Sequence, residues 1–456
     1  MTTNYHELNK GLSHKNNLRK LMINLAPPYV LLFCVILLIA LGTAALLMPF
    51  STTEPITFLQ SLFTATSAVT VTGLGVVDTG TQFTPLGQAI ITLLIQFGGI
   101  GLMTFAVVTI IALGGKLSFL KQSIAKEALG QTNTKTLYTT AKAVILFSIT
   151  AECIGIIILS SYWLPEYGIS ESLFKSFFYV VSAFNNAGFA LEPDNLMKYV
   201  EDPVVNLVIS LLIISGGLGF SVWIDIKNNR TWTKLSIYSK LMILSTLVIN
   251  LSAFLAFFML EKSNEGTLAN LSNTGKLLAS WFQAVSPRTA GFNTIDYSKV
   301  TDSTTLLTIL LMFIGGGSLS TAGGIKVVTF VVIILASINY IRRNNRLTLY
   351  KREIAPTLIH KAFSMAVFTI LLIWFSTFIL TLSENAHILD LVFEVISALS
   401  TVGLSRGLTS NLSNLGLILI IILMIIGRIG PLTFVYLFAT PKESKLKFAE
   451  TKIPIG

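Results

Sequence analysis

Long apolar runs alternate with short, half-polar stretches along the chain, and the first of them predict a sequence of helices. The run from Tyr29 to Pro49 is long enough for one spanning helix. Residues 51–55 then supply hydroxyls, an acid and a proline, which are signals for a helix start. The helix that follows reaches only to about Ser67, and roughly 14 residues cannot cross a bilayer that needs about 20. We therefore expect a re-entrant hairpin, enclosed by protein or a water-filled pore, before a second spanning helix from Thr84 to Leu113.

The short helix ends in a motif that recurs three more times. Each copy contains a glycine with an aromatic residue ten positions before it. Successive glycines lie 115, 103 and 112 residues apart, which predicts a fourfold repeat of about one hundred residues. The four copies are Thr70-Val71-Thr72-Gly73, Asn185-Asn186-Ala187-Gly188, Arg288-Thr289-Ala290-Gly291 and Ser400-Thr401-Val402-Gly403.

The other three repeats follow the same order of spanning helix, short helix, glycine loop and closing helix. We predict an all-α polytopic membrane protein with eight spanning helices and four re-entrant pore helices around one pore. The predicted repeats are residues 28–113, 139–224, 235–338 and 356–440, between a terminal segment of residues 1–27 and a tail of residues 441–456. Their first helices are expected near Ala141, Lys240 and Ala362, their short helices near Ser170, Leu268 and Ala386, and their closing helices near Pro203, Ser303 and Leu412.

Composition supports the membrane class. The chain is 53% hydrophobic and 12% charged, well below the charge content of about 25% that is usual in soluble domains. Its net charge of +10 does not indicate nucleic-acid binding, because Lys and Arg fill every second connection and acidic residues fill the others. This alternation is the positive-inside pattern of an even number of spans. We expect a multi-pass protein of the cell membrane with both termini in the cytoplasm.

Signals for enzymatic chemistry are not visible in the sequence. Cys34 and Cys153 lie inside apolar runs and favour packing roles, and the four histidines show no metal-ligand spacing. There is no Walker motif, catalytic triad or metal-ligand cluster, so we expect no enzyme activity and no covalently bound cofactor.

Four short helices that end at four glycine loops suit the binding of a cation. Each helix C-terminus carries about half a negative charge, and a glycine lets the following carbonyls face one axis without a Cβ clash. Such carbonyls can replace the hydration shell of a potassium ion. We interpret the four motifs as the walls of an ion-selectivity filter, the alternative being that each loop is a tight turn that packs helices. The expected potassium ligands are the carbonyls of Thr72, Gly73, Ala187, Gly188, Ala290, Gly291, Val402 and Gly403.

A second glycine signature follows each motif in the closing helices, and its third copy is rich enough in glycine to break a helix. Residues 315–324 interrupt an apolar stretch, and each glycine costs about 1 kcal/mol in a helix. We expect an intramembrane loop that acts as a gate together with Arg428, which places a positive barrier below the filter. The predicted gate residues are Gly315, Gly316, Gly317, Ser318, Thr321, Gly323, Gly324, Lys326 and Arg428.

Several charged residues in the apolar segments leave two interpretations open. Arg428 could also pair with carbonyls of the broken helix or with Glu152, and Lys326 could extend toward the cytoplasm. We expect Arg288 to brace loop carbonyls or an outer carboxylate rather than to touch the ion. Glu152 fits either a proton or sodium site or a packed, paired carboxyl group. The glycine pairs of the first two closing helices fit close helix packing.

The four filter-like loops, the broken third closing helix and the Gly427-Arg428 signature resemble the Trk/Ktr/HKT superfamily of potassium translocators. The resemblance extends from Pro28 to about Thr440 and is nearest to the Ktr-type membrane subunit, because eight spans are predicted without an additional N-terminal helix pair. It implies potassium uptake through a channel-like pore. It also implies one selectivity glycine in each repeat, here Gly73, Gly188, Gly291 and Gly403.

The same resemblance implies sodium-stimulated uptake and homodimers, each subunit with its own pore, on a cytosolic ring of nucleotide-binding regulatory subunits. The basic loops of residues 114–142, 225–240 and 339–356 are the candidate docking surface for that ring. Only the first motif keeps Thr-Val-Thr-Gly, so we expect an asymmetric and less selective filter. The alternative from another class is a sodium-coupled secondary transporter of a small organic solute, built with broken helices.

Overall fold

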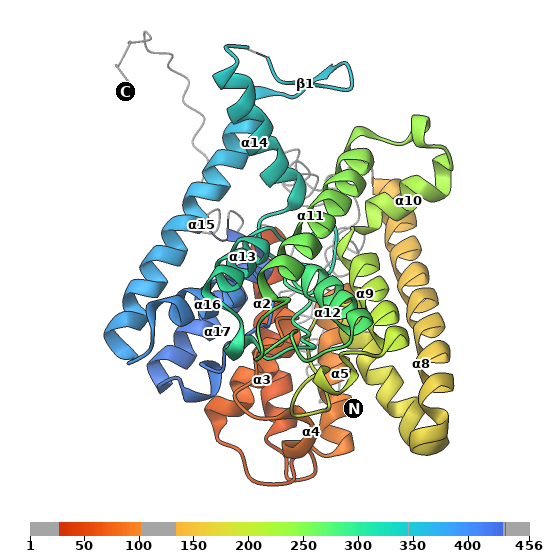
Figure 1. Ribbon diagram of the computed structural model, residues 1–456, viewed down its shortest axis with the longest axis vertical. Coiled ribbons are helices and arrows are strands. Elements are labelled where there is room, and N and C mark those ends of the chain that lie inside the picture. Colours follow the sequence, from red (N-terminus) through yellow and green to blue (C-terminus); the bar gives the residue numbers. More distant parts are fainter. Residues whose placement is uncertain (1–26, 102–133, 345, 432–433, 435–456) are drawn as a thin grey trace, which may run out of the picture.

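The computed structural model describes residues 27–101, 134–344, 346–431 and 434, and this part of the chain is almost entirely helical (Figure 1). Nearly all of the predicted terminal segment, the whole predicted tail and most of the basic loop at residues 114–142 lie outside the described residues. The predicted last part of the first closing helix, residues 102–113, also lies outside them. The described helices fall into four successive groups.

The first group contains α2 (Pro27–Leu46), α3 (Phe58–Thr70), α4 (Thr79–Gln82) and α5 (Pro85–Gln96), which continues as a π-helix over Phe97–Gly101. Helix α3 begins later than residues 51–55 suggest, because its cap is a capping box between Thr57 and Gln60. The earlier hydroxyls have other partners: the Ser51 hydroxyl donates to the Ala45 carbonyl at 2.7 Å and the Thr53 hydroxyl to the Thr81 carbonyl at 2.7 Å.

The second group shows two sharp breaks. Its elements are α8 (Thr134–Phe184), α9 (Pro203–Gly217) and α10 (Phe220–Asn229). Within α8 the predicted long and short helices meet at a kink, where Gly168 has a φ of 74° shortly after Pro165. Helices α9 and α10 are bent by 90° relative to each other. The sequence favoured simple packing for the glycine pair here, but the helix also breaks, because Gly219 adopts a φ of 94° that L side chains rarely take.

The third and fourth groups repeat the order of long, short and closing helices. The third contains α11 (Ile237–Glu261), α12 (Asn273–Val285), α13 (Asp302–Phe313) and α14 (Val327–Ile341). The antiparallel strands β1 (Thr348–Leu349) and β2 (Arg352–Glu353) follow, and the fourth group contains α15 (Pro356–Ser383), α16 (Ile388–Leu399) and α17 (Asn414–Ile429). Short 3₁₀ turns lie at Met197–Tyr199, Trp232–Lys234, Tyr297–Lys299 and Thr409–Asn411.

The four groups close on one another in a ring. Within groups, α3 packs on α2 and α5, α12 on α11, and α16 on α15 and α17. Between groups, α5 packs on α8, α9 on α12, and α13 on α16. Helix α17 then packs on α3, which joins the last group to the first. In Figure 1 the long helices α8 and α15 lie at the right and left edges of the view, with α3, α12 and α16 between them.

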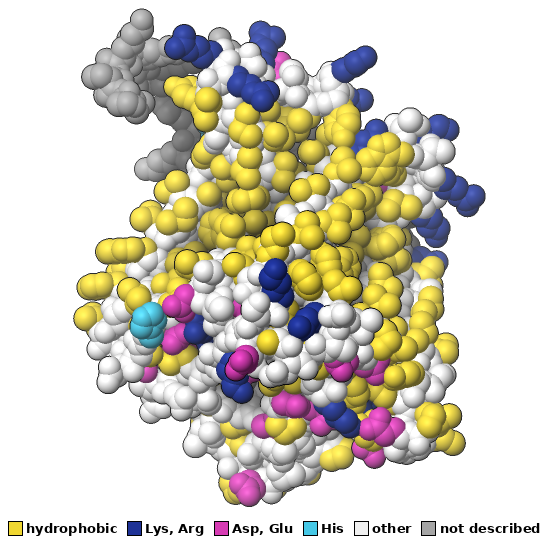
Figure 2. All heavy atoms as spheres, viewed as in Figure 1, with side chains coloured by type: hydrophobic (Ala, Val, Ile, Leu, Met, Phe, Trp, Pro, Cys, Tyr) yellow, Lys and Arg dark blue, Asp and Glu magenta, His cyan; other side chains and the backbone are white. Residues whose placement is uncertain are grey.

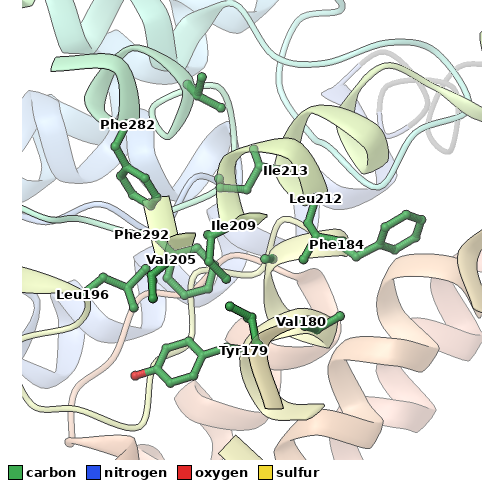
Figure 3. Close-up of a cluster of buried hydrophobic side chains, with 14 of the residues drawn as sticks. Tyr179, Val180, Phe184, Leu196, Val205, Ile209, Leu212, Ile213, Phe282 and Phe292 are labelled. Atoms are coloured by element: carbon green, nitrogen blue, oxygen red, sulfur yellow. The ribbon is translucent and has the colours of Figure 1, made fainter. Parts of the chain in front are cut away.

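Aromatic and aliphatic side chains hold neighbouring groups together. One cluster joins α8 and α9 to α12 and the segment after it, so that Phe184 and Ile209 share a core with Phe282 and Phe292 (Figure 3). Each such side chain contributes about 1.5–3 kcal/mol when fully buried. Because this core crosses from the second group to the third, it fixes the relative positions of their loops.

A broad apolar surface covers the middle of the face shown in Figure 2. The described part of the chain has three helices long and apolar enough to cross a membrane, within Lys142–Phe184, Ile237–Glu261 and Pro356–Ser383. They become four if α9 and α10 count as one bent span. Lys and Arg side chains gather at the end that carries β1 and α10, and most acidic side chains in this view lie in the opposite half. The predicted number of eight spans stays a prediction.

Two adjacent glycines of the closing helix α9 allow a test of how closely this helix approaches the end of α8. A Cβ at Gly216 would lie 1.9 Å from the carbonyl oxygen of Phe184, whereas the nearest atom to a Cβ at Gly217 is the Asn186 amide nitrogen at 3.3 Å. We expect Gly216→Ala to lower the free energy of unfolding by about 1–3 kcal/mol because a backbone atom must move. Gly217→Ala is the matched control and should be close to neutral. Thermal unfolding of the purified proteins measures both, and equal stability of the two variants would contradict this packing.

Candidate functional site

Each of the four predicted motifs forms a loop with the same unusual backbone. We name residues 70–73, 185–188, 288–291 and 400–403 the first to fourth glycine loops. Two positions before each glycine, a residue with a side chain adopts the left-handed conformation, with φ between 50° and 78°. This conformation costs roughly 1–2 kcal/mol for a non-glycine residue, so its fourfold occurrence indicates a geometry that the surrounding contacts enforce. The residues are Val71, Asn186, Thr289 and Thr401, and their glycines also have positive φ, between 69° and 95°.

A serine in or directly after each preceding short helix is hydrogen-bonded to the backbone of the loop region. In the first and fourth loops the Ser67 and Ser397 hydroxyls accept hydrogen bonds from the amides of Gly73 and Gly403, at 3.0 and 3.1 Å. In the second loop the Ser182 hydroxyl donates to the carbonyl of Phe189 at 2.8 Å. Six residues before the third glycine the chain has Val285 instead of a serine, and the contact there is made by its neighbour.

That neighbour is Ser286, whose hydroxyl donates to the carbonyl of Phe292. The sequence has serines six residues before the glycine in three of the four repeats. Their bonding to the loop could not be read from it, because the third repeat shifts the hydroxyl by one residue.

The glycines of the four loops touch one another in a closed cycle. A Cβ on Gly73 would lie 2.3 Å from the carbonyl oxygen of Ala187, and one on Gly188 would lie 2.8 Å from that of Ala290. The cycle continues from Gly291 to the carbonyl of Val402 at 2.3 Å, and from Gly403 to that of Thr72 at 2.0 Å. The structure thus brings together all four predicted motifs, and each glycine is required because the next loop occupies the place of its side chain.

Carbonyl oxygens are the chemical groups that this ring offers. Those of Thr72, Ala187, Ala290 and Val402 are buried, and no donor among the described residues is hydrogen-bonded to them. Buried carbonyls are normally paired. The C-terminal ends of four short helices, each with about half a negative charge, converge on the same point. Unpaired carbonyls in a negative potential are chemically suited to a dehydrated cation.

The predicted break between α13 and α14 is present and lies against the second closing helix. The amide of Gly317 donates to the carbonyl of Gly217 at 2.8 Å, and that of Gly315 to the carbonyl of Ile325 at 2.8 Å. We refer to the segment as loop 315–324. Tyr238 of α11, which the sequence did not single out, accepts from the Ser318 amide at 2.8 Å and holds the loop from outside.

Arg428 connects loop 315–324 to the first closing helix. Its guanidinium donates to the carbonyl of Thr321 and to the carbonyls of Gly98 and Gly99. Of the partners considered from the sequence, these contacts match the carbonyls of the broken helix and not Glu152. Lys326 turns back into the loop, where its ammonium donates to the Ala322 carbonyl at 2.7 Å instead of extending away.

Arg288 points away from the ring. Its backbone belongs to the third glycine loop, but its guanidinium donates to the Asn250 amide oxygen at 2.9 Å and the Thr246 hydroxyl at 3.5 Å, both on α11. The sequence predicts a bracing role for this side chain. It does not predict the partners, which are neutral side chains instead of loop carbonyls or a carboxylate, because α11 is distant in sequence.

Glu152 lies behind the second glycine loop and is hydrogen-bonded there. The Gln96 amide donates to both carboxylate oxygens at 2.9 and 3.0 Å, and the Asn185 amide donates to Gln96 Oε1 at 2.7 Å. This arrangement fits the packed and paired carboxyl group, one of the two interpretations that the sequence left open. Through Gln96, it ties the first closing helix to the start of the second loop.

Fold and contacts together define a helical membrane protein whose four loops enclose a ring of carbonyl oxygens, a form suited to cation transport. Residues 8–448 match the TrkH family, which is described as a cation transport protein family. The chain belongs to this family. It is a multi-pass membrane protein, and its family is one of cation transporters.

Individual relatives agree with this assignment. The chain is 47% identical over 434 residues to Ktr system potassium uptake protein B of Bacillus subtilis (strain 168), covering 95% of this chain and 98% of that protein. It is 34% identical over 451 residues to potassium/sodium uptake protein NtpJ of Enterococcus hirae, covering 97% and 99%. The crystal structure of the potassium transporter TrkH from Vibrio parahaemolyticus superposes with a TM-score of 0.72 at 19% identity, over 90% of this chain and 84% of that one, and so shares the fold.

The contact of Arg288 with α11 can be tested by stability. Asn250→Leu removes the amide acceptor at 2.9 Å and leaves a buried guanidinium with the hydroxyl at 3.5 Å, so we expect a loss of about 1–3 kcal/mol in the free energy of unfolding. The double variant Asn250→Leu/Arg288→Met replaces both partners by apolar groups and should recover most of that loss. Thermal unfolding in detergent measures both, and a double variant that is as unstable as the sum of its single changes would contradict the pairing.

Proposed function

We propose that this chain is the potassium-translocating membrane subunit of a Ktr-type uptake system. The observation that carries the proposal is the closed cycle of four glycines, each in contact with a carbonyl of the next loop. A ring of unpaired carbonyls can replace the hydration shell of a potassium ion as it passes. The eight carbonyls of the residue pairs 72–73, 187–188, 290–291 and 402–403 are the proposed ligands.

The proposed architecture is four repeats around one pore, with eight spans and four re-entrant helices. Its support is the shared order of elements in the four groups and the ring of contacts that closes with α17 on α3. Acidic side chains gather in the half of the molecule that holds α3 and α4, and basic ones at the end with β1. We assign the acidic half to the outside and the basic end, with both termini, to the cytoplasm.

Loop 315–324 and Arg428 are the proposed gate. The loop lies on the cytoplasmic side of the glycine ring in this orientation, and the guanidinium holds its Thr321 carbonyl. A fixed positive charge at that place opposes the passage of a cation. Movement of the loop, with its bond to Arg428 released, would open the path.

Sodium stimulation, homodimers and a cytosolic nucleotide-binding regulatory ring complete the proposal. The relative named potassium/sodium uptake protein supports a role for sodium. The relative named as part of a Ktr system supports a further component, since a system implies more than one protein. The basic surface formed by residues 225–240 and 339–356, with β1 and β2 between exposed arginines, is the proposed docking surface.

A sodium-coupled transporter of an organic solute is less well supported. The glycine loops touch one another through backbone atoms, which provides oxygen ligands for an ion at their centre. An organic solute instead requires a pocket in which side chains contact most of its surface.

The assignment of the glycine ring predicts the effect of Gly73→Ser on selectivity. The added side chain must displace the carbonyl of Ala187, which a Cβ would approach to 2.3 Å, and therefore distorts the ligand cage. We expect wild-type proteoliposomes to take up radioactive rubidium at least about tenfold faster than sodium, and the variant to lose most of that ratio. Equal fluxes of both ions through the wild type would refute potassium selectivity, and an unchanged ratio in the variant would refute the filter assignment.

The gate assignment predicts a gain of function. Arg428→Ala removes the bonds to Thr321, Gly98 and Gly99, so loop 315–324 is held less firmly and the positive barrier is lost. We expect rubidium flux to rise several-fold, because one charge-assisted bond is worth about 1.5–3 kcal/mol. Arg288→Met is the comparison, since that arginine is also buried but bonds to α11. Unchanged flux in Arg428→Ala would contradict a gate at this position.

A further inference from the structure

Loop 315–324 rests directly on two of the four glycine loops. On one side the Thr321 hydroxyl lies 3.3 Å from the Phe184 carbonyl and 3.5 Å from the amide oxygen of Asn186, which belongs to the second glycine loop. On the other side Gly323 is in contact with the fourth loop, because a Cβ there would lie 2.1 Å from the Thr401 hydroxyl and 2.8 Å from the Ser400 carbonyl. All of these side chains are buried.

The two supporting glycine loops lie opposite each other in the ring. The cycle of glycine contacts runs from the first loop through the second and third to the fourth, so the second and fourth are never neighbours. The third loop reaches loop 315–324 through its neighbour, since the Asn186 amide donates to the Thr289 hydroxyl at 3.2 Å. The first loop has Val71 at the equivalent position, which cannot form a hydrogen bond through its side chain.

Asn186 and Thr401 occupy the same place in their loops: both are the left-handed residues two positions before the glycine. Their side chains contact loop 315–324, whereas the carbonyls of the next residues, Ala187 and Val402, face the neighbouring glycines. The side chains and the carbonyls therefore have separate partners. A change in these side chains can alter the support of loop 315–324 without removing a carbonyl from the ring.

We propose that Asn186 and Thr401 are positioning residues that seat loop 315–324 across the glycine ring from two opposite sides. Seating is asymmetric, because the first glycine loop has the apolar Val71 at the equivalent position. Departures from strict fourfold symmetry in the motifs thus reflect contact with the loop as well as contact with an ion. The inference rests on the proposed function only where it identifies the seated loop with the closed gate.

The position of the loop can be measured independently of transport. Ser320 is buried and directly precedes Thr321, so a cysteine placed there reacts slowly with a water-soluble maleimide while the loop is seated. The background is Cys34→Ala/Cys153→Ser, and the protein is the full chain in proteoliposomes. Rubidium flux and the rubidium-to-sodium flux ratio are measured on matched proteins that lack the Ser320→Cys change.

Two unseating variants act on opposite sides. Thr321→Val removes the hydroxyl that faces Asn186, and Gly323→Ala adds a Cβ against Thr401. We expect each to increase maleimide labelling and rubidium flux several-fold with an unchanged ion ratio. Thr321→Ser keeps the hydroxyl and should label at the wild-type rate. Gly323→Ala/Thr401→Ala relieves the side-chain part of the clash and should label more slowly than Gly323→Ala.

The outcomes separate the two proposals. Labelling that stays at the wild-type rate in both unseating variants, or rises equally in Thr321→Ser, would overturn the seating. Faster labelling with unchanged flux would support the seating while refuting the gate. A collapsed rubidium-to-sodium ratio in Thr321→Val would also overturn the inference, because the side chains and carbonyls would then not act separately.

Discussion

The close contact between a glycine of one loop and a carbonyl of the next is the constraint on which the structure depends. A carbonyl oxygen at 2.0–2.8 Å from the position of a Cβ leaves no room for any side chain. Four such contacts can form together only if four helix ends reach the same point at the same depth. The serine bonds within each loop, the kink at Gly168 and the packing of α17 on α3 all serve that requirement.

Much of this arrangement could be predicted from the sequence, because it depends on local and periodic features. The four motifs, the helix starts near Pro203 and Ser303, and the break over residues 315–324 follow from hydrophobic run lengths, capping residues and glycine content. The meeting of the four motifs followed from their repetition, since equivalent segments of a repeat occupy equivalent places. The TrkH family membership agrees with the resemblance that these motifs carried.

The partners of the buried polar groups could not be predicted. Arg288 bonds to Asn250, Glu152 to Gln96, and Arg428 to Gly98, and each pair joins residues far apart in the chain. A sequence shows that a charge in an apolar segment needs a partner, but three-dimensional packing chooses it. The break at Gly219 was missed for a related reason, since its glycines also permit an unbroken, closely packed helix.

Closure of the ring by the last group on the first has a consequence for biosynthesis. Thr72 and Gly73 belong to the earliest loop, and their contact with Gly403 joins positions more than three hundred residues apart. During translation the first three groups can enter the membrane and pack, but the circle stays incomplete until α16 and α17 arrive. A nascent or truncated chain that lacks the fourth group therefore cannot form the closed ring of glycine contacts.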